Sequence, residues 1–311
     1  MTIAEAQEQI IRLKREHGIC ILAHSYQARE IIEVADHTGD SYKLSVAAAG
    51  DEKSVAIMCG VRFMAETVKL LSPEKTVYLA NADAGCPMAD GLSAERLRAA
   101  QAKYPGCVTV CYINTTAEVK TLSDVCVTSS SAVKIIRAMP ETEILFVPDC
   151  NLGAYVAAQV PEKTIRLISG GCPIHAAVSA DDVAAARRAH PEALLLVHPE
   201  CVPDVTSRAD YVGSTSGIYD FAVSSEKKEF IIGTEISIAE HLQYARPDKK
   251  FYPLTKKLMC HNMKLTTLMD VYNCVLTASC VREADKQITM SPETIMKARR
   301  CIDEMIRLGG K

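Results

Sequence analysis

The sequence predicts an α/β protein of three pseudo-threefold-related αβα units. Each unit holds a parallel sheet between two helical layers, and the three surround one central cavity. Three observations lead to this fold class: an internal repeat, the alternation of short apolar runs with amphipathic segments, and polar residues that directly follow several of the runs. Strands that alternate with helices are typical of βαβ units, and ligands of such sheets gather beyond the carboxyl ends of the strands.

The internal repeat becomes visible when the chain is shifted by 86 residues. Residues 85–105 (GCPMADGLSAERLRAAQAKYP) then align with residues 171–191 (GCPIHAAVSADDVAAARRAHP). Residues 108–119 continue onto 194–205 without a gap. Two copies of one supersecondary unit are therefore expected in this part of the chain.

The N-terminal part fits the same pattern with a shift of 88 residues. A helix that begins with a capping box of Thr2 and Glu5 precedes a strand at 20–24. This copy lacks the leading strand and the Gly-Cys-Pro turn, which residues 250–260 would supply, as in a circularly permuted repeat. The predicted units are residues 1–74 with 252–311, residues 75–161, and residues 162–251.

Short apolar runs mark the predicted strands of the second and third units. They are TVYLA (76–80), VTVCYI (108–113), EILFV (143–147), TIRLI (164–168), ALLLV (193–197) and EFIIG (229–233).

Composition excludes several classes of function. The 311 residues carry 35 basic and 38 acidic side chains and no Trp, so the cationic grooves and stacking platforms of nucleic-acid binders are not expected. We see no signal peptide and no run long enough to span a membrane, so we expect a soluble, cytoplasmic protein. Thirteen cysteines, an odd number without a secretory signal, argue against a disulfide framework.

Three cysteines share a context that the others lack. Cys86, Cys172 and Cys260 each follow a predicted strand, at intervals of 86 and 88 residues. Packing alone would explain them as buried repeat features. Three thiolates also suit zinc or an iron–sulfur cluster. His175 could complete a zinc site, or a fourth iron could stay open as a Lewis acid.

Polar residues occupy equivalent positions at the strand ends of all three copies. Such residues can move protons or orient a substrate. The set comprises His24 and Tyr26, Tyr112 and Asn114, and His198 and Glu200. A further set of hydroxyls, at Ser41, Ser129 and Thr215, lies where loops should lead into helices, which suits either capping or the binding of anions. No Walker or dinucleotide fingerprint occurs, so ATP and NAD are not suggested.

Ten segments together resemble the quinolinate synthase family, in order and over essentially the whole chain. They are AHSYQ (23–27), CGVRFMAET (59–67), ADAGCPMAD (82–90), YIN (112–114), VTSSSAV (127–133), PDCNLG (148–153), HPEC (198–201), GSTSGI (213–218), GTE (233–235) and CHNMK (260–264).

The resemblance implies an enzyme of de novo NAD biosynthesis that condenses iminoaspartate with dihydroxyacetone phosphate. It also implies a [4Fe–4S] cluster on Cys86, Cys172 and Cys260 with one open iron, and a functional link to an L-aspartate oxidase or dehydrogenase. The resemblance further implies that Tyr26 and Glu200 are the main proton-transfer residues and that His24 and His198 assist them. The implied substrate-binding residues are His24, Ser41, Tyr112, Asn114, Ser129, His198, Glu200 and Thr215, and Tyr112 also belongs to the implied catalytic set.

Two departures from the family pattern stand out. Cys150 replaces a more polar residue in PDCNLG, which puts a cavity role there in doubt. The Cys-x-x-Cys of some longer members is absent after Cys260, so no redox switch of that kind is expected. Two alternative hypotheses for the function are a metal-binding or redox-sensing protein without catalysis, and a zinc lyase or hydrolase that uses Cys172 and His175 as ligands.

Overall fold

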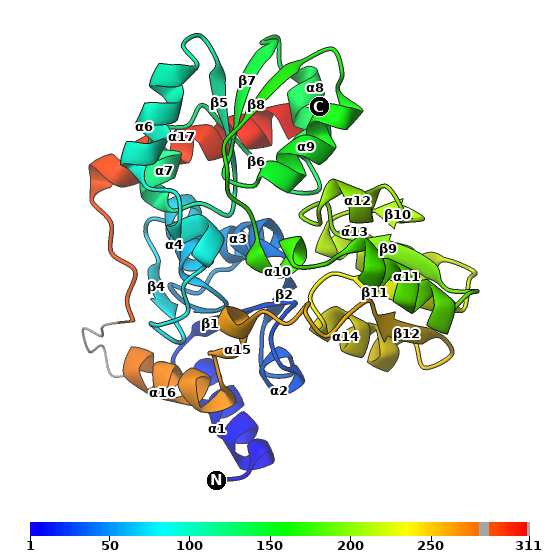
Figure 1. Ribbon diagram of the computed structural model, residues 1–311. Coiled ribbons are helices and arrows are strands. Elements are labelled where there is room, and N and C mark those ends of the chain that lie inside the picture. The colour runs from blue at the N-terminus through cyan, green and yellow to red at the C-terminus, as the bar shows by residue number, and fades with distance from the viewer. Residues whose placement is uncertain (280–285, 310–311) are drawn as a thin grey trace.

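The protein contains three four-stranded parallel sheets of identical topology, which confirms the predicted fold class. The computed structural model describes residues 1–279 and 286–309. The strand orders are β2-β1-β3-β4, β6-β5-β7-β8 and β10-β9-β11-β12, and the three sheets surround a common centre (Figure 1). The strands are β1 (Ile19–His24), β2 (His37–Gly39), β3 (Val55–Cys59), β4 (Thr76–Leu79), β5 (Val108–Tyr112), β6 (Val125–Val127), β7 (Glu143–Val147), β8 (Thr164–Leu167), β9 (Leu194–Val197), β10 (Tyr211–Val212), β11 (Glu229–Gly233) and β12 (Lys250–Pro253).

Helices cover both faces of each sheet, because successive strand residues point to opposite sides. In the first sheet, Ile21 and Ile57 face α1 and α16, whereas Leu22 and Met58 face α3 and α4. The helices of the first unit are α1 (Ile3–Glu16), α2 (Arg29–Ile32), α3 (Ser41–Gly50), α4 (Arg62–Leu71) and α16 (Leu268–Ser279). The helix α1 begins with the expected Thr2–Glu5 capping box.

The second and third sheets repeat this arrangement. The helices around the second sheet are α6 (Ala94–Lys103), α7 (Ala117–Lys120), α8 (Ala132–Ala138), α9 (Cys150–Gln159) and α17 (Pro292–Gly309). Those around the third are α11 (Ala180–Ala189), α12 (Pro203–Thr206), α13 (Thr215–Ser224) and α14 (Ser237–Ala245). Three one-turn helices, α5 (Pro87–Asp90), α10 (Pro173–Ala176) and α15 (His261–Lys264), connect successive units or lead away from the last sheet.

A repeated aspartate explains part of the sequence periodicity. In each copy it follows a short helix, and its carboxylate accepts a hydrogen bond from a backbone N–H of the first strand. The pairs are Asp36 with Ile21 (2.8 Å), Asp124 with Thr109 (2.8 Å) and Asp210 with Leu195 (2.7 Å). Because an unpaired buried N–H is costly, these carboxylates stabilise the start of each sheet.

A repeated lysine was not recognised from the sequence. In all three units its ammonium group donates to backbone carbonyls at or just after the C-terminal end of the helix that precedes the sheet's third strand in the chain. The three residues are Lys75, Lys163 and Lys249, again 88 and 86 residues apart. Their main-chain contacts fix the ends of the helices that lead into the central strands.

Strand membership differs from the expected unit limits in one consistent way. Strands β4 and β8, expected to lead the second and third units, instead pair in parallel with β3 and β7 and end the preceding sheets. Strand β12, expected to supply the leading strand of the first unit, likewise pairs with β11 and ends the third sheet. The sequence repeat aligned each cysteine turn with the helix after it, but the chain changes sheets at the turn itself. Of the C-terminal segment expected to close the first unit, α16 packs on α1 and β3 of that unit. Helix α17 packs mainly on β6, α7 and α8 of the second unit and also on α4 of the first.

No helix in the described ranges is both long and apolar enough to cross a membrane.

Candidate active site

The carboxyl ends of the three sheets face one cavity. All twelve residues singled out from the sequence line it, so the fold brings together side chains that lie up to 236 residues apart. They are His24, Tyr26, Ser41, Cys86, Tyr112, Asn114, Ser129, Cys172, His198, Glu200, Thr215 and Cys260. The cysteine of PDCNLG, Cys150, is not among the lining residues.

The three cysteines occupy equivalent positions, each directly before a one-turn helix that follows the last strand of a sheet. Backbone N–H groups two and three residues further on donate to each thiol, for example those of Met88 and Ala89 to Cys86. A carboxylate accepts the backbone N–H of each cysteine: Asp90 for Cys86 (2.8 Å), Asp149 for Cys172 (3.0 Å) and Glu235 for Cys260 (3.4 Å).

This donor set fits a multi-atom metal centre. Burial raises the pKa of all three thiols, to about 12 for Cys86, so a bound cation is needed to hold them as thiolates at neutral pH. Their sulfur atoms do not form a set within 4.8 Å, the spacing that marks groups suited to a single ion. Hydrogen bonds from backbone N–H groups to the sulfurs are one of the factors that tune iron–sulfur clusters. The residues therefore fit a group that is several ångströms across.

His24 and His198 are held in the same tautomer by the same local contact. The Nδ1 atom of His24 accepts from the N–H of Tyr26 (3.1 Å), and that of His198 accepts from the N–H of Glu200 (3.3 Å). Burial lowers the pKa of each imidazole to about 4. Both rings are therefore neutral at pH 7, and their Nε2–H groups are left as hydrogen-bond donors.

A buried chain of hydrogen bonds connects Tyr26 with Glu200. The Tyr26 hydroxyl lies 2.7 Å from Thr215 Oγ1 and 2.9 Å from Thr234 Oγ1. Thr234 Oγ1 lies 3.1 Å from His175 Nε2, and His175 Nδ1 lies 2.9 Å from Glu200 Oε2. The same Nδ1 lies 3.2 Å from Cys172 Sγ, so one imidazole contacts both a candidate metal ligand and a candidate base.

Glu200 is the only carboxylate among the three pairs of strand-end residues, and it is buried. Burial on its own would raise its pKa, but nearby His198 and His175 and hydrogen bonds from His175 and Tyr112 lower it to about 2. Glu200 is therefore ionised at neutral pH. Burial and the charge of Glu200 raise the pKa of Tyr112, which also hydrogen-bonds to Ser129.

The part of the cavity near Ser41 and Thr215 suits anions without a cationic side chain. Helices α3 and α13 begin at these two residues, so the positive end of each helix dipole lies beside the cavity. Among the described residues that line the cavity, none is Lys or Arg. Asp40 accepts from Ser216 Oγ (2.8 Å), which joins the first and third units beside this region.

Sequence reasoning missed several residues of the site. His175 was considered only as a zinc ligand, and the bridging Thr234 was not considered. Asp149 and Glu235, which hold two of the cysteine turns, lie 86 residues apart, so the repeat alone could have identified them. Burial and nearby Glu200 raise the pKa of Asp149 to about 7.

Three sheets that direct thiols, imidazoles and an ionised carboxylate into one cavity define an α/β enzyme with a site for a metal cofactor. A family model described as "Quinolinate synthetase A protein" matches residues 8–307. A curated quinolinate synthase of Caldicellulosiruptor saccharolyticus is 48% identical over 99% of this chain and 100% of its own. That of Methanoregula boonei is 46% identical over 97% and 98%. The chain belongs to the quinolinate synthetase A protein family and is a quinolinate-forming enzyme of NAD biosynthesis.

Proposed function

We propose that the enzyme condenses iminoaspartate with dihydroxyacetone phosphate to form quinolinate, phosphate and two waters. One carbon–carbon and one carbon–nitrogen bond close the ring, the carbon–oxygen bond to phosphate breaks, and no external oxidant is needed. The iminoaspartate would come from an oxidase or dehydrogenase that acts on L-aspartate. The observation that carries the proposal is the convergence of three cysteine turns with Tyr26 and Glu200 on one cavity.

Cys86, Cys172 and Cys260 would hold a [4Fe–4S] cluster with three ligands from the protein. When bound, its open iron would supply Lewis acidity towards oxygen or nitrogen atoms of the substrate. The equivalent N–H···S contacts at all three cysteines support this assignment.

The remaining polar residues would orient the two substrates. The Nε2–H groups of His24 and His198 can donate to carboxylate or carbonyl oxygens, because both Nδ1 atoms are occupied. Ser41, Ser129 and Thr215 would bind phosphate or carboxylate groups through their hydroxyls and the adjacent helix N-termini. Asn114 and Tyr112 complete this polar wall from the second sheet.

Proton transfer would use both ends of the buried hydrogen-bond chain. The Glu200 carboxylate accepts a proton from substrate carbon, and the Tyr26 hydroxyl donates one to a departing oxygen. Thr234 and His175 then return a proton from Glu200 to Tyr26 through contacts of 2.9–3.1 Å. Such a relay lets a base and an acid be restored together between successive dehydrations.

The test is quinolinate formation by anaerobically purified enzyme with iminoaspartate and dihydroxyacetone phosphate. Glu200→Gln removes the base but keeps an oxygen for His175, so turnover should fall about 10²- to 10⁴-fold. Glu192→Gln, at an exposed position before β9, is the control and should keep full activity. Full turnover by Glu200→Gln with unchanged iron content would remove Glu200 from the proposed role.

A zinc site remains the specific competitor. Single ligand atoms of Cys172, His175 and Glu200 lie within 4.8 Å of one another, which a single ion could bridge. Metal analysis separates the two: the cluster predicts iron, sulfide and a brown protein with broad absorption near about 400 nm. Colourless, active protein with stoichiometric zinc and no iron would overturn the cluster assignment.

A further inference from the structure

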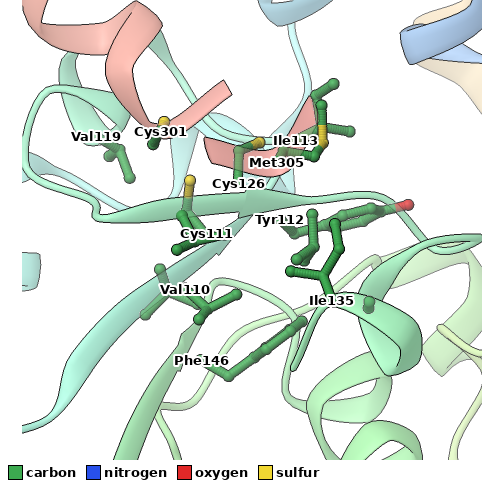
Figure 2. Close-up of a cluster of buried hydrophobic side chains, with 14 of the residues drawn as sticks. Val110, Cys111, Tyr112, Ile113, Val119, Cys126, Ile135, Phe146, Cys301 and Met305 are labelled. Carbon is green, nitrogen blue, oxygen red and sulfur yellow. The ribbon is translucent and has the colours of Figure 1, made fainter. Parts of the chain in front are cut away.

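A second group of thiols lies outside the active-site cavity, in the core of the second unit. Cys111 on β5, Cys126 on β6 and Cys301 on α17 are fully buried, and their sulfur atoms all lie within 4.8 Å of one another. Figure 2 shows the three side chains clustered where the strands meet the C-terminal helix. Cys111 and Cys126 are direct partners in the parallel ladder, whereas Cys301 is 175 residues beyond Cys126.

Buried cysteines often act as small apolar side chains, but a buried cation lies beside this group. The Lys120 side chain is fully buried, and its ammonium group donates to the Ile113 carbonyl and to the carbonyl and hydroxyl of Thr115. All three acceptors are neutral. Glu66 acts on Lys120 only at longer range, without an ion pair, and burial raises the pKa of Glu66. The positive charge is thus left without a carboxylate in contact.

The thiols are already organised around Cys111. Its side-chain contacts with Cys126 and Cys301, together with the charge of Lys120, lower its pKa against the effect of burial. The Ser123 hydroxyl, which donates to the Val119 carbonyl, also lies beside Cys111. Cys301 has one further contact, to the carbonyl of Ala298 at 3.2 Å.

We propose that Cys111, Cys126 and Cys301 form a closed thiolate site for Zn²⁺ that attaches the C-terminal helix to the second sheet. Zinc–sulfur bonds of about 2.3 Å place the sulfurs of one ion about 3.8 Å apart, so only small side-chain shifts are needed. Three thiol protons leave to solvent on binding. The resulting site carries one net negative charge, which Lys120 neutralises. Ser123 is the neighbouring oxygen that can complete four-coordination.

Such a site would be structural rather than catalytic. None of the three cysteines lines the active-site cavity. A metal bound only by the folded chain stabilises it in proportion to its affinity and concentration. The ion would connect two strands with a helix from the far end of the chain, and so oppose the release of α17.

The experiment uses the full-length holoenzyme, purified anaerobically from zinc-replete cells, with metal content and zinc-edge X-ray absorption as readouts. We expect one zinc per chain beside the full iron content, with three sulfur neighbours at about 2.3 Å. Cys301→Ala should lose the zinc, keep the iron and lower the melting temperature. Cys260→Ala should lose the iron and keep the zinc. Cys274→Ala is the matched control, since this equally buried cysteine belongs to the first unit.

Three of the four contrary results are measured on the wild-type protein, so they decide the question even if a variant fails to fold. Holoenzyme with full iron and less than a tenth of an equivalent of zinc would overturn the proposal. So would bound zinc with only nitrogen and oxygen neighbours, or zinc retained by Cys301→Ala. A disulfide between two of the three cysteines, found by alkylation and mass spectrometry of anaerobically unfolded protein, would also reject it.

Discussion

Acid should destabilise this enzyme through the two buried imidazoles of His24 and His198. Burial lowers the pKa of each ring to about 4, from the ordinary value of 6.5. Between these values the unfolded chain binds protons that the folded protein does not, so stability falls as the pH drops from 6.5 to 4. This effect is absent above pH 6.5 and complete below pH 4.

The size of the effect follows from the same shifts. At pH 5, about 1.5 pH units below the ordinary value, each ring should cost about 2 kcal/mol, since one pH unit corresponds to about 1.4 kcal/mol. The two rings together should therefore remove about 4 kcal/mol, a large part of the 5–15 kcal/mol that stabilises a typical domain.

The assay compares urea unfolding at pH 7 and pH 5 for the wild type and a His24→Gln/His198→Gln double variant. Both proteins are brought to the same iron content before unfolding. Carboxylates titrate in both, so the difference between the two pH dependences isolates the imidazoles. We expect the wild type to lose about 4 kcal/mol more than the variant. Equal losses would show that the rings take up protons in the folded state and would falsify the assignment of neutral Nε2–H donors.

Two further predictions concern a residue of the proposed proton relay and a residue that stabilises the fold. Tyr26→Phe removes the hydroxyl that is hydrogen-bonded to Thr215 and Thr234 but keeps the ring, so kcat should fall about 10²- to 10⁴-fold with little change in iron content. The control is Tyr219→Phe, in a neighbouring groove. Equal turnover of the two variants would contradict the relay. Asp210→Ala removes the acceptor for Leu195 N–H and for Arg187, so the free energy of unfolding, measured with urea, should fall by about 1–3 kcal/mol. Asp210→Asn keeps an acceptor oxygen, so its free energy of unfolding should fall less. The reverse order would refute the role of this aspartate.

The fold class could be predicted because its signals are local and repeated. Three features can be recognised from the sequence alone: the alternation of apolar strands with helices, the two shifts of 86 and 88 residues, and the Gly-Cys-Pro turns. The limits of the units could not be found this way. A repeat alignment identifies which residues are equivalent, but strand pairing decides to which sheet an edge strand such as β4 belongs.

The candidate site was predictable to a similar depth. Strand ends, cysteine turns and helix starts could be predicted from their positions in the repeat, and all twelve of those residues line one cavity. The contacts of His175 were not predictable, because Thr234 and Glu200 approach it from other turns of the third unit. Nor could the cluster around Cys301 be found, because α17 packs on the second unit, far from its place in the sequence.

The cysteine turns form a symmetric part of the cavity and the strand-end pairs an asymmetric part. This difference accounts for which repeat positions keep the same residue in all three units. The cysteine turns keep one residue type and equivalent N–H···S contacts, as the proposed cluster, with its threefold axis, would require. The strand-end pairs keep their backbone position but change their chemistry, from His24 in the first unit to Tyr112 in the second. A substrate without symmetry needs a different hydrogen-bond donor or base on each side. Because the backbone positions repeat, only a difference in the side chains can provide this. Glu200, the one carboxylate among the strand-end pairs, would therefore define where the proposed reaction takes up a proton in an otherwise repeated frame.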